Sequence, residues 1–520
     1  MAGAAGRVSA ATLVSRVTGL LRETGSAALC GLSPLSDAFV FAFRIPNLLR
    51  EFFAEGALSS AFVPVFARVR KEQGDAEAFV LARRMLGTLA AVTGLLVLLG
   101  IAFAPVIVDV VASDAPDAQR PLTVALTRIM FPFLALAALA AVAMGVLNTH
   151  RRYFLPALAP AAFNVVAVLG GGVLLLLGWP AEQALLAWAG LVVLGGLAQV
   201  LVQVPALRSV GLRGAPSVDL AFRDPRLREV AGRMGPVVIS LAGTNVMLLL
   251  TTAMASRGAG WATGLSFAFR LVHLPIGIVG VSIGTVVLAA GARSHAAGES
   301  GGLDDVVRRG LKLSWFLAAP AAVGLAVLAE PLVRMVYGHG RFAEGEGVAL
   351  TADALAWYAG AVVAYAGTKA SVALFLARGD TRTPALCSLV GIAANLAVAY
   401  GTLGAFGTQG YRALALAVVV GTVVNFVLLR VLGRVRFGSA SAPGAGYVGR
   451  VLLASAAMGA VGWVVLLAQP RPGALLTLAL CAGLGLLYFL LTALLGLPEA
   501  GEVARRLRLL RGRGPRQAAP

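Results

Sequence analysis

Long apolar segments make up most of this chain, and their length is the feature that most restricts its fold. Runs of roughly 20 apolar residues recur from end to end, each long enough to cross a ~30 Å hydrocarbon core. They do not alternate with a period of two, as the strands of a membrane β-barrel would. The sequence therefore predicts an all-α polytopic membrane protein. We expect fourteen spans, near residues 8–30, 36–67, 79–112, 121–148, 154–178, 182–206, 234–256, 262–291, 310–336, 347–377, 384–406, 412–433, 447–468 and 473–496.

Composition agrees with this class. Only 13% of the residues are charged, against about a quarter in soluble domains, and the 62 glycines suit close helix packing in lipid. Cys30, Cys387 and Cys481 are widely separated, which predicts neither a disulfide framework nor a metal site. A cleavable signal peptide is not expected, because Arg16 and Arg22 interrupt the first apolar run.

The basic residues indicate topology. The net charge is +19, but the basic side chains are spread over short loops instead of forming one stripe, so a nucleic-acid partner is not expected. With the N-terminus inside, the even-numbered turns and both termini hold about 30 of the 43 Lys and Arg residues, and the opposite loops hold about six. This bias predicts that both termini lie in the cytoplasm.

Two lobes of six spans each are expected. Residues 207–233 form the longest break and are predicted to be a cytoplasmic linker with an interfacial helix. Two weak internal echoes support a duplication: FRIPNLL (43–49) matches FRLVHLP (269–275), and HRRYFLP (150–156) matches GDTRTP (379–384). The predicted domains are an N-terminal lobe (1–206), the linker (207–233), a C-terminal lobe (234–436), two extra helices (437–497) and a basic cytoplasmic tail (498–520).

About seven basic residues fall inside predicted spans, where a charge costs at least ~2.5–3.5 kcal/mol at the bilayer centre. Arg128, near the outer start of its span, can be explained by a long side chain that reaches the headgroups. For Lys369 this explanation and a role in a cavity both stay open. The others concentrate in the first two spans and at the matching place in the second lobe: Arg16, Arg22, Arg44, Arg50 and Arg270. They predict a hydrated cationic cavity between helices, with structural ion pairs as the alternative.

The second span, FRIPNLLREFFAEGALSSAF (43–62), carries most of this prediction. Arg50 and Asn47 are three residues apart and share a helix face, and Pro46 is expected to kink the helix. Glu51 and Glu55 are four residues apart, so at least one is expected to pair with an arginine and orient it.

Asp37 begins the same span and is expected to cap it or to pair with an arginine. Several arginines without excess acid favour a multiply charged anion such as a pyrophosphate, whose oxygens fit guanidinium groups. A cation antiporter would need acidic side chains instead. The four histidines are dispersed, and there is no P-loop and no nucleophile–base cluster. The chain is therefore predicted to be a transporter that uses no cofactor, and not an enzyme.

Four segments resemble the MviN/MurJ-type lipid II flippases of the multidrug/oligosaccharidyl-lipid/polysaccharide exporter superfamily. They are SRVTGLLRE (15–23), SDAFVFAFRIPNLLREFFAEGALSSAFVPVF (36–66), LNTHRRYFLPALAP (147–160) and FRLVHLPIGIVGVSIGT (269–285). The resemblance implies two pseudo-symmetric six-helix lobes plus two C-terminal helices. It also implies a multi-pass protein of the bacterial plasma membrane that moves undecaprenyl-pyrophosphate-linked peptidoglycan precursor to the outer leaflet.

The resemblance also assigns roles by position. It places the substrate-binding arginines at Arg16, Arg22, Arg50 and Arg270, and supporting cavity residues at Asp37, Arg44, Asn47 and Glu55. Two positions depart from the family pattern, where Phe269 and His273 replace acidic residues. Spans 234–256, 384–406 and 412–433 contain no carboxylate, so no sodium site is predicted.

The expected mechanism is alternating access, in which the arginines hold the pyrophosphate and the polyprenyl tail stays in lipid beside the last two helices. The expected partners are the precursor, membrane lipids and the cell-wall synthesis machinery, and the chain is expected to be a monomer. Two alternatives stay open: a flippase for another lipid-linked oligosaccharide, and a non-transport cell-wall polymerase.

Overall fold

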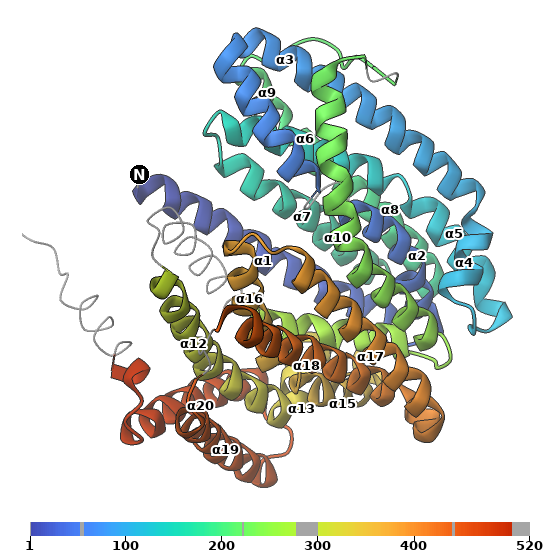
Figure 1. Ribbon diagram of the computed structural model, residues 1–520. Coiled ribbons are helices and arrows are strands. Elements are labelled where there is room, and N and C mark those ends of the chain that lie inside the picture. The colour runs from blue at the N-terminus through green and yellow to red at the C-terminus, as the bar shows by residue number, and fades with distance from the viewer. Residues whose placement is uncertain (1, 52–56, 221–222, 277–299, 439–442, 502–520) are drawn as a thin grey trace, which may run out of the picture. The chain divides into compact units, whose positions relative to one another are not determined.

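A computed structural model describes residues 2–51, 57–220, 223–276, 300–438 and 443–501, and these fold as α-helices with short connections and no β-strand (Figure 1). Among them, eight helical stretches are long and apolar enough to cross a membrane, or nine if α15 and α16, bent by 45°, count as one broken span. The predicted all-α polytopic class is confirmed. The count of fourteen spans stays a prediction.

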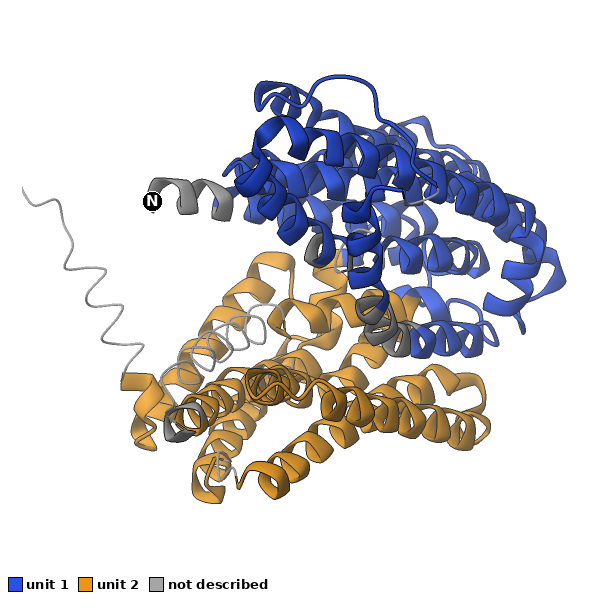
Figure 2. Ribbon diagram, turned by 45° about the horizontal axis from the view of Figure 1, so that its top comes forward, with its two compact units in different colours: residues 1–263, 337–347 blue, residues 264–336, 348–520 orange. Residues whose placement is uncertain are grey.

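The described chain divides into two compact units, coloured separately in Figure 2: residues 1–263 with 337–347, and residues 264–336 with 348–520. The helices of unit 1 are α1 (Ala2–Cys30), α2 (Pro34–Arg50), α3 (Ala57–Ala102), α4 (Ala104–Val111), η2 (Asp117–Gln119), α5 (Arg120–Met130), α6 (Phe133–Thr149), α7 (Phe154–Leu177), α8 (Ala181–Leu201), α9 (Val204–Ser209), α10 (Pro225–Ala255) and α14 (Arg341–Glu344).

The remaining helices belong to unit 2. Its helices are α12 (Ser300–Val327), α13 (Ala329–Tyr337), α15 (Gly347–Ala359), α16 (Val362–Ala377), α17 (Arg382–Phe406), η3 (Gly407–Gln409), α18 (Gly410–Phe437), α19 (Ala445–Ala468) and α20 (Ala474–Leu494). A further helical segment begins at Trp261 and is described up to residue 276. The predicted spans near 154–178, 384–406, 412–433, 447–468 and 473–496 match α7, α17, α18, α19 and α20 within a few residues.

Packing in unit 1 centres on α3 and α6. Phe62, Phe66 and Leu81 of α3 are almost fully buried, together with Val142 and Val146 of α6. Burial of such side chains is worth roughly 1.5–3 kcal/mol each where the surroundings are aqueous, and within lipid the gain comes from close van der Waals contact. Helix α6 of this core also contacts α2, α7 and α8.

Helix α3 joins the second and third predicted spans in one helical stretch with a single break at Gly74. There φ is 85° and ψ is 175°, a conformation that only glycine adopts without strain. The predicted cytoplasmic turn 68–84 is therefore largely helical.

Within the predicted linker 207–233, the described residues 213–220 and 223–226 form a strap that is bonded to α3. Ser217 donates its backbone N–H to the Arg83 carbonyl (3.1 Å), and Asp219 donates to the Thr88 hydroxyl (2.9 Å). A side chain at Gly87 would collide with the Ser217 carbonyl, 2.2 Å from an ideal Cβ, so this close approach requires a glycine. The short helix of this region, α9, ends at Ser209, before the strap begins.

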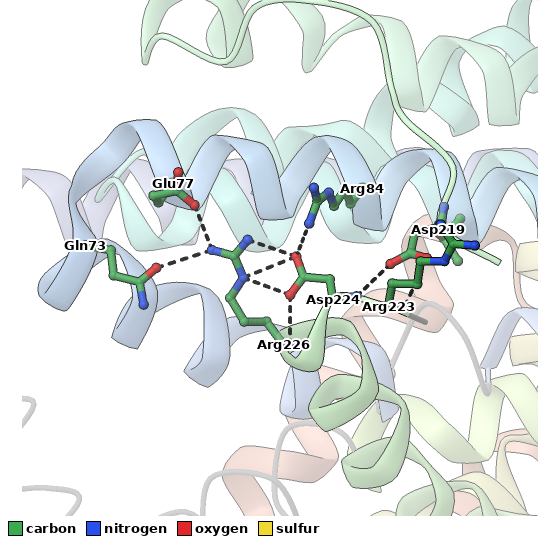
Figure 3. A network of polar contacts seen from close by, with 8 residues as sticks. Gln73, Glu77, Arg84, Asp219, Arg223, Asp224 and Arg226 are labelled. Carbon is green, nitrogen blue, oxygen red and sulfur yellow. Dashed lines mark hydrogen bonds and ion pairs between the residues drawn. The ribbon is translucent and has the colours of Figure 1, made fainter. Parts of the chain in front are cut away.

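An ionic network holds the end of the strap (Figure 3). Asp224, almost fully buried, caps α10 by accepting the Arg226 N–H (2.9 Å) and pairs with the Arg84 (2.8 Å) and Arg226 (2.9 Å) guanidinium groups. Arg226 also reaches Glu77 at 3.0 Å. Burial alone would raise the pKa of the Asp224 carboxyl, but hydrogen bonds from Arg226 and Arg84 override it and bring this pKa to about 2. Asp224 therefore stays ionised throughout the physiological pH range.

The strap places α10 beside α3 (Figure 1), within unit 1. Arg68 of α3 adds a two-pronged ion pair with Glu229 of α10. The lobe boundary predicted near residue 234 rests on a sequence repeat. The two compact units are defined by contacts and do not test that repeat, so the boundary stays a prediction.

Candidate functional site

Helix α1 carries the first two predicted arginines. Arg16 is exposed and Arg22 is half-buried on this helix. The Arg22 guanidinium pairs with Glu23 and lies over the ring of Phe163 of α7, 5.1 Å from the ring centroid. A cation above an aromatic face is stabilised by the ring quadrupole. Arg22 is therefore held by a neighbouring helix while part of it stays accessible.

Asn164 of α7 fixes α1 between its two arginines. Its side-chain amide donates to the Ser15 carbonyl (3.1 Å) and to the Thr18 hydroxyl (3.4 Å), and the side chain is buried. The helices can approach because residue 19 is glycine, where an ideal Cβ would lie 3.3 Å from the Asn164 amide nitrogen. Sequence analysis missed this residue, although a lone asparagine within the apolar run 154–178 was a usable signal.

We expect Asn164→Leu to reduce transport several-fold while the protein still folds. The change removes hydrogen bonds worth about 1 kcal/mol each and frees α1 to rotate. Gln203→Leu is the matched control, because this buried amide donates to the Ala140 carbonyl (3.3 Å) away from α1. Transport and thermal unfolding would be measured for both. If both variants lose transport in proportion to stability, α1 is not positioned by Asn164.

Helix α2 carries Asn47 and Arg50 on one face, as the sequence predicted. Arg50 Nε donates to the side-chain oxygen Oδ1 of Asn47 (3.0 Å), and the side-chain amide nitrogen of Asn47 donates to Glu51 (3.0 Å). The carboxylate thus orients the arginine through the amide. Arg44 lies half-buried on the same helix, and Glu55 lies outside the described residues.

Pro46 does not end α2, which continues through this residue to Arg50. The helix begins with Ser33, whose hydroxyl accepts from the Ser36 N–H while the Ser36 hydroxyl accepts from the Ser33 N–H. This reciprocal pair supplies the N-terminal cap.

Asp37 has a different role from either predicted one, since Ser33 caps the helix and the carboxylate binds a distant turn. The side chain is 2% exposed. It accepts from Gly260 N–H (2.6 Å), Thr263 N–H (2.8 Å) and the Thr263 hydroxyl (2.7 Å). These donors belong to the first turn of the helical segment that begins at Trp261. Asp37 therefore caps a helix 223 residues further along the chain.

A second acidic residue bonds the turn before that helix to another part of unit 1. Asp114 pairs with Arg257 (3.0 Å), and its backbone N–H donates to the Ser256 hydroxyl (3.0 Å). Residues 256–263 are thus bonded to both Asp37 and Asp114. The predicted topology places these two residues on the outer side of the membrane.

Arg270 is exposed on the helical segment that starts at Trp261 and belongs to unit 2. Around it, the two residues that depart from the family pattern form an aromatic cluster. Phe269 lies 4.2 Å from His273 and 5.5 Å from Tyr358, measured between ring centroids. Arg16, Arg22 and Arg50 belong to unit 1, and the convergence of all four arginines on one ligand stays a prediction.

No group of three or more His, Cys, Asp or Glu side chains that could hold a metal ion occurs in the described part of the chain. Cys30, Cys387 and Cys481 are free cysteines.

The fold defines a class of protein. It matches a solved structure titled as the inward-facing conformation of a multidrug resistance MATE family transporter of the MOP superfamily, with a TM-score of 0.66, 15% identity and coverage of 82% of this chain and 98% of that one. It also matches a structure titled as lipid II flippase MurJ in an inward closed conformation, with a TM-score of 0.77, 22% identity and coverage of 94% and 98%. The chain thus shares the fold of these two solved structures.

Sequence comparison identifies the family within this class. The model described as lipid II flippase MurJ matches residues 26–482, and the chain belongs to this family. The lipid II flippase MurJ of Burkholderia cenocepacia is 36% identical over 429 residues, which cover 81% of each chain. The probable lipid II flippase MurJ of Rhizobium tropici is 32% identical over 523 residues, covering 96% of this chain and 95% of the relative.

Proposed function

We propose that this chain is a lipid II flippase, which moves undecaprenyl-pyrophosphate-linked peptidoglycan precursor from the cytoplasmic to the outer leaflet. The observation that carries the proposal is the family match over residues 26–482. Support from the site comes from arginines within otherwise apolar helices, which suit a pyrophosphate. The protein is a transporter and not an enzyme.

Arg16, Arg22 and Arg50, together with Arg270, bind the pyrophosphate in an alternating-access cycle. Two of these arginines have a neighbour that limits their freedom: Phe163 stacks on Arg22 and Asn47 accepts from Arg50. Such preorganisation lowers the entropy lost on binding. Because the bound groups are charged, the membrane potential can drive the cycle, at about 2.3 kcal/mol per charge per 100 mV.

The polyprenyl tail stays in lipid along α19 and α20. Both helices are apolar and expose large side chains, among them Leu453, Trp463 and Leu475. They are anchored to unit 2 by the Tyr488 hydroxyl, which donates to the Phe316 carbonyl at 2.7 Å. The chain acts as a monomer of the bacterial plasma membrane with both termini in the cytoplasm, close to the cell-wall synthesis machinery.

Depletion of the protein in growing cells tests the function. We expect lipid II to accumulate with its headgroup on the cytoplasmic side, where an impermeant headgroup-modifying reagent added outside does not reach it. Re-expression is the control and should restore access. Accumulation in the outer leaflet would contradict the flippase proposal and favour a polymerase that consumes the same precursor.

A further inference from the structure

Two turns at equivalent positions of the two units have the same backbone geometry. After α6, Arg151 N–H donates to the Asn148 carbonyl (3.0 Å) and Arg152 N–H to the Leu147 carbonyl (2.9 Å). After α16, Gly379 N–H donates to the Leu376 carbonyl (3.0 Å) and Asp380 N–H to the Phe375 carbonyl (2.9 Å). Both pairs of hydrogen bonds form the Schellman motif that ends a helix. The similarity between HRRYFLP and GDTRTP in sequence therefore extends to their backbone conformation.

The residue at the left-handed position differs between the two turns. In unit 2 it is Gly379, with φ of 75°, and in unit 1 it is Arg151, with φ of 58°. A side chain at this position is disfavoured because its Cβ approaches the following carbonyl. Arg151 is the one non-glycine residue with positive φ in the described part of the chain. The fold alone would favour glycine at residue 151, as it has at residue 379.

The next residue shows the same contrast. In unit 2 it is Asp380, whose carboxylate accepts from the Thr383 N–H (3.0 Å) and pairs with Arg436 (2.8 Å), so this turn is closed by its own polar groups. In unit 1 it is Arg152, and the structure records no hydrogen bond or ion pair for the side chain of Arg151 or Arg152 among the described residues. Two unpaired cations thus stand where the related turn has a glycine and a paired acid.

The surroundings of Arg151 suit a phosphate at a membrane surface. A hollow of about 470 Å³ reaches the turn at Thr149, and its charged lining residues are Arg70, Lys71 and Asp75 of α3. Arg70 is held in place, because it donates to the Thr149 carbonyl (2.7 Å) and to Asp75 (2.6 Å). On the other side, Tyr153 and Phe154 are 46% and 45% exposed. Exposed aromatic rings beside basic residues are typical of the membrane–water interface.

We propose that Arg151, Arg152 and Lys71 form a site for the phosphate of a lipid in the cytoplasmic leaflet. Guanidinium groups bind phosphate oxygens through charge-assisted hydrogen bonds, and the aromatic pair places the site at headgroup depth. The left-handed backbone of Arg151 is kept because the side chain it carries is needed for binding. The site lies on unit 1 by itself and does not depend on the cavity mechanism proposed above.

The test separates strain from binding. In detergent without anionic lipid, we expect Arg151→Gly to raise the melting temperature by about 1–2 °C, since the strain is relieved. In the same variant, the affinity for phosphatidylglycerol, measured by native mass spectrometry of the full chain, should fall about tenfold, the equivalent of one charge-assisted hydrogen bond. Arg151→Lys keeps the charge and should keep most of the affinity.

Arg382→Gln is the matched control, because this exposed arginine follows the related turn in unit 2. It should leave lipid affinity unchanged. A second arm replaces phosphatidylglycerol with undecaprenyl pyrophosphate in neutral lipid and shows which lipid carries the bound phosphate. The proposal is overturned if Arg151→Gly binds both lipids like the parent protein, if phosphatidylcholine binds equally well, or if Arg382→Gln loses as much affinity.

Discussion

The Arg50→Ala substitution is expected to lower the rate of lipid II translocation at least ten- to a hundred-fold, while the protein remains folded. The guanidinium is half-buried on α2 and is oriented by its Nε bond to Asn47 (3.0 Å). A hydrogen bond to a charged group is worth about 1.5–3 kcal/mol, which corresponds to this range. Arg50→Lys keeps a charge but loses the fork that matches a pyrophosphate, so it should recover only part of the activity.

Arg270→Ala is expected to behave in the same way, and Arg128→Ala is the control for both. Arg128 also lies in an apolar region, but it is exposed and donates to the Ile101 carbonyl at 3.3 Å. Translocation would be followed by the accessibility of the lipid II headgroup from outside, at matched expression. Full activity of Arg50→Ala and Arg270→Ala would show that the arginines do not bind the substrate.

The second large effect is expected at Asp37. Asp37→Ala would leave the N–H groups of Gly260 and Thr263 buried without an acceptor. Each unsatisfied donor costs about 1–3 kcal/mol, so we expect a loss of about 2–6 kcal/mol in stability. Asp37→Asn keeps one acceptor oxygen and should lose less. Thermal unfolding in detergent measures the effect.

A double-mutant cycle separates this bond from general damage to α2. Thr263→Val removes only the hydroxyl that donates to Asp37 (2.7 Å), and its cost should shrink in the Asp37→Ala background because the partner is already gone. Additive losses would mean that the two side chains do not interact. Ser36→Ala serves as a neighbouring control, because it weakens the cap of α2 without touching the distant turn.

Those features of the fold that depend on residues close in sequence could be predicted. The length of an apolar run sets the length of a membrane helix, which is why α17 and α20 fall where expected. The shared face of Asn47 and Arg50 follows from helical spacing, and the structure has the hydrogen bond between them.

Partners distant in sequence could not be predicted in this way. Asp37 was expected to serve its own helix or an arginine, because nothing local indicates Gly260 and Thr263 as its donors. Residues 207–233 were expected to be a linker with an interfacial helix, because they contain Pro, Gly and alternating charges. Their charges pair with side chains of α3 such as Arg84 and Glu77, and only the folded chain reveals that complementarity.

The strap on α3 has a mechanical consequence. The strap joins α9 to α10, and both helices belong to unit 1. The described residues from 213 to 220 and from 223 to 226 are bonded to α3 and lead into α10, so the strap supplies no crossing between the units. The chain passes between the units at residues 263–264, 336–337 and 347–348. If the units rotate against each other, as the alternating-access proposal requires, we expect the changes in backbone dihedral angles near these three crossings.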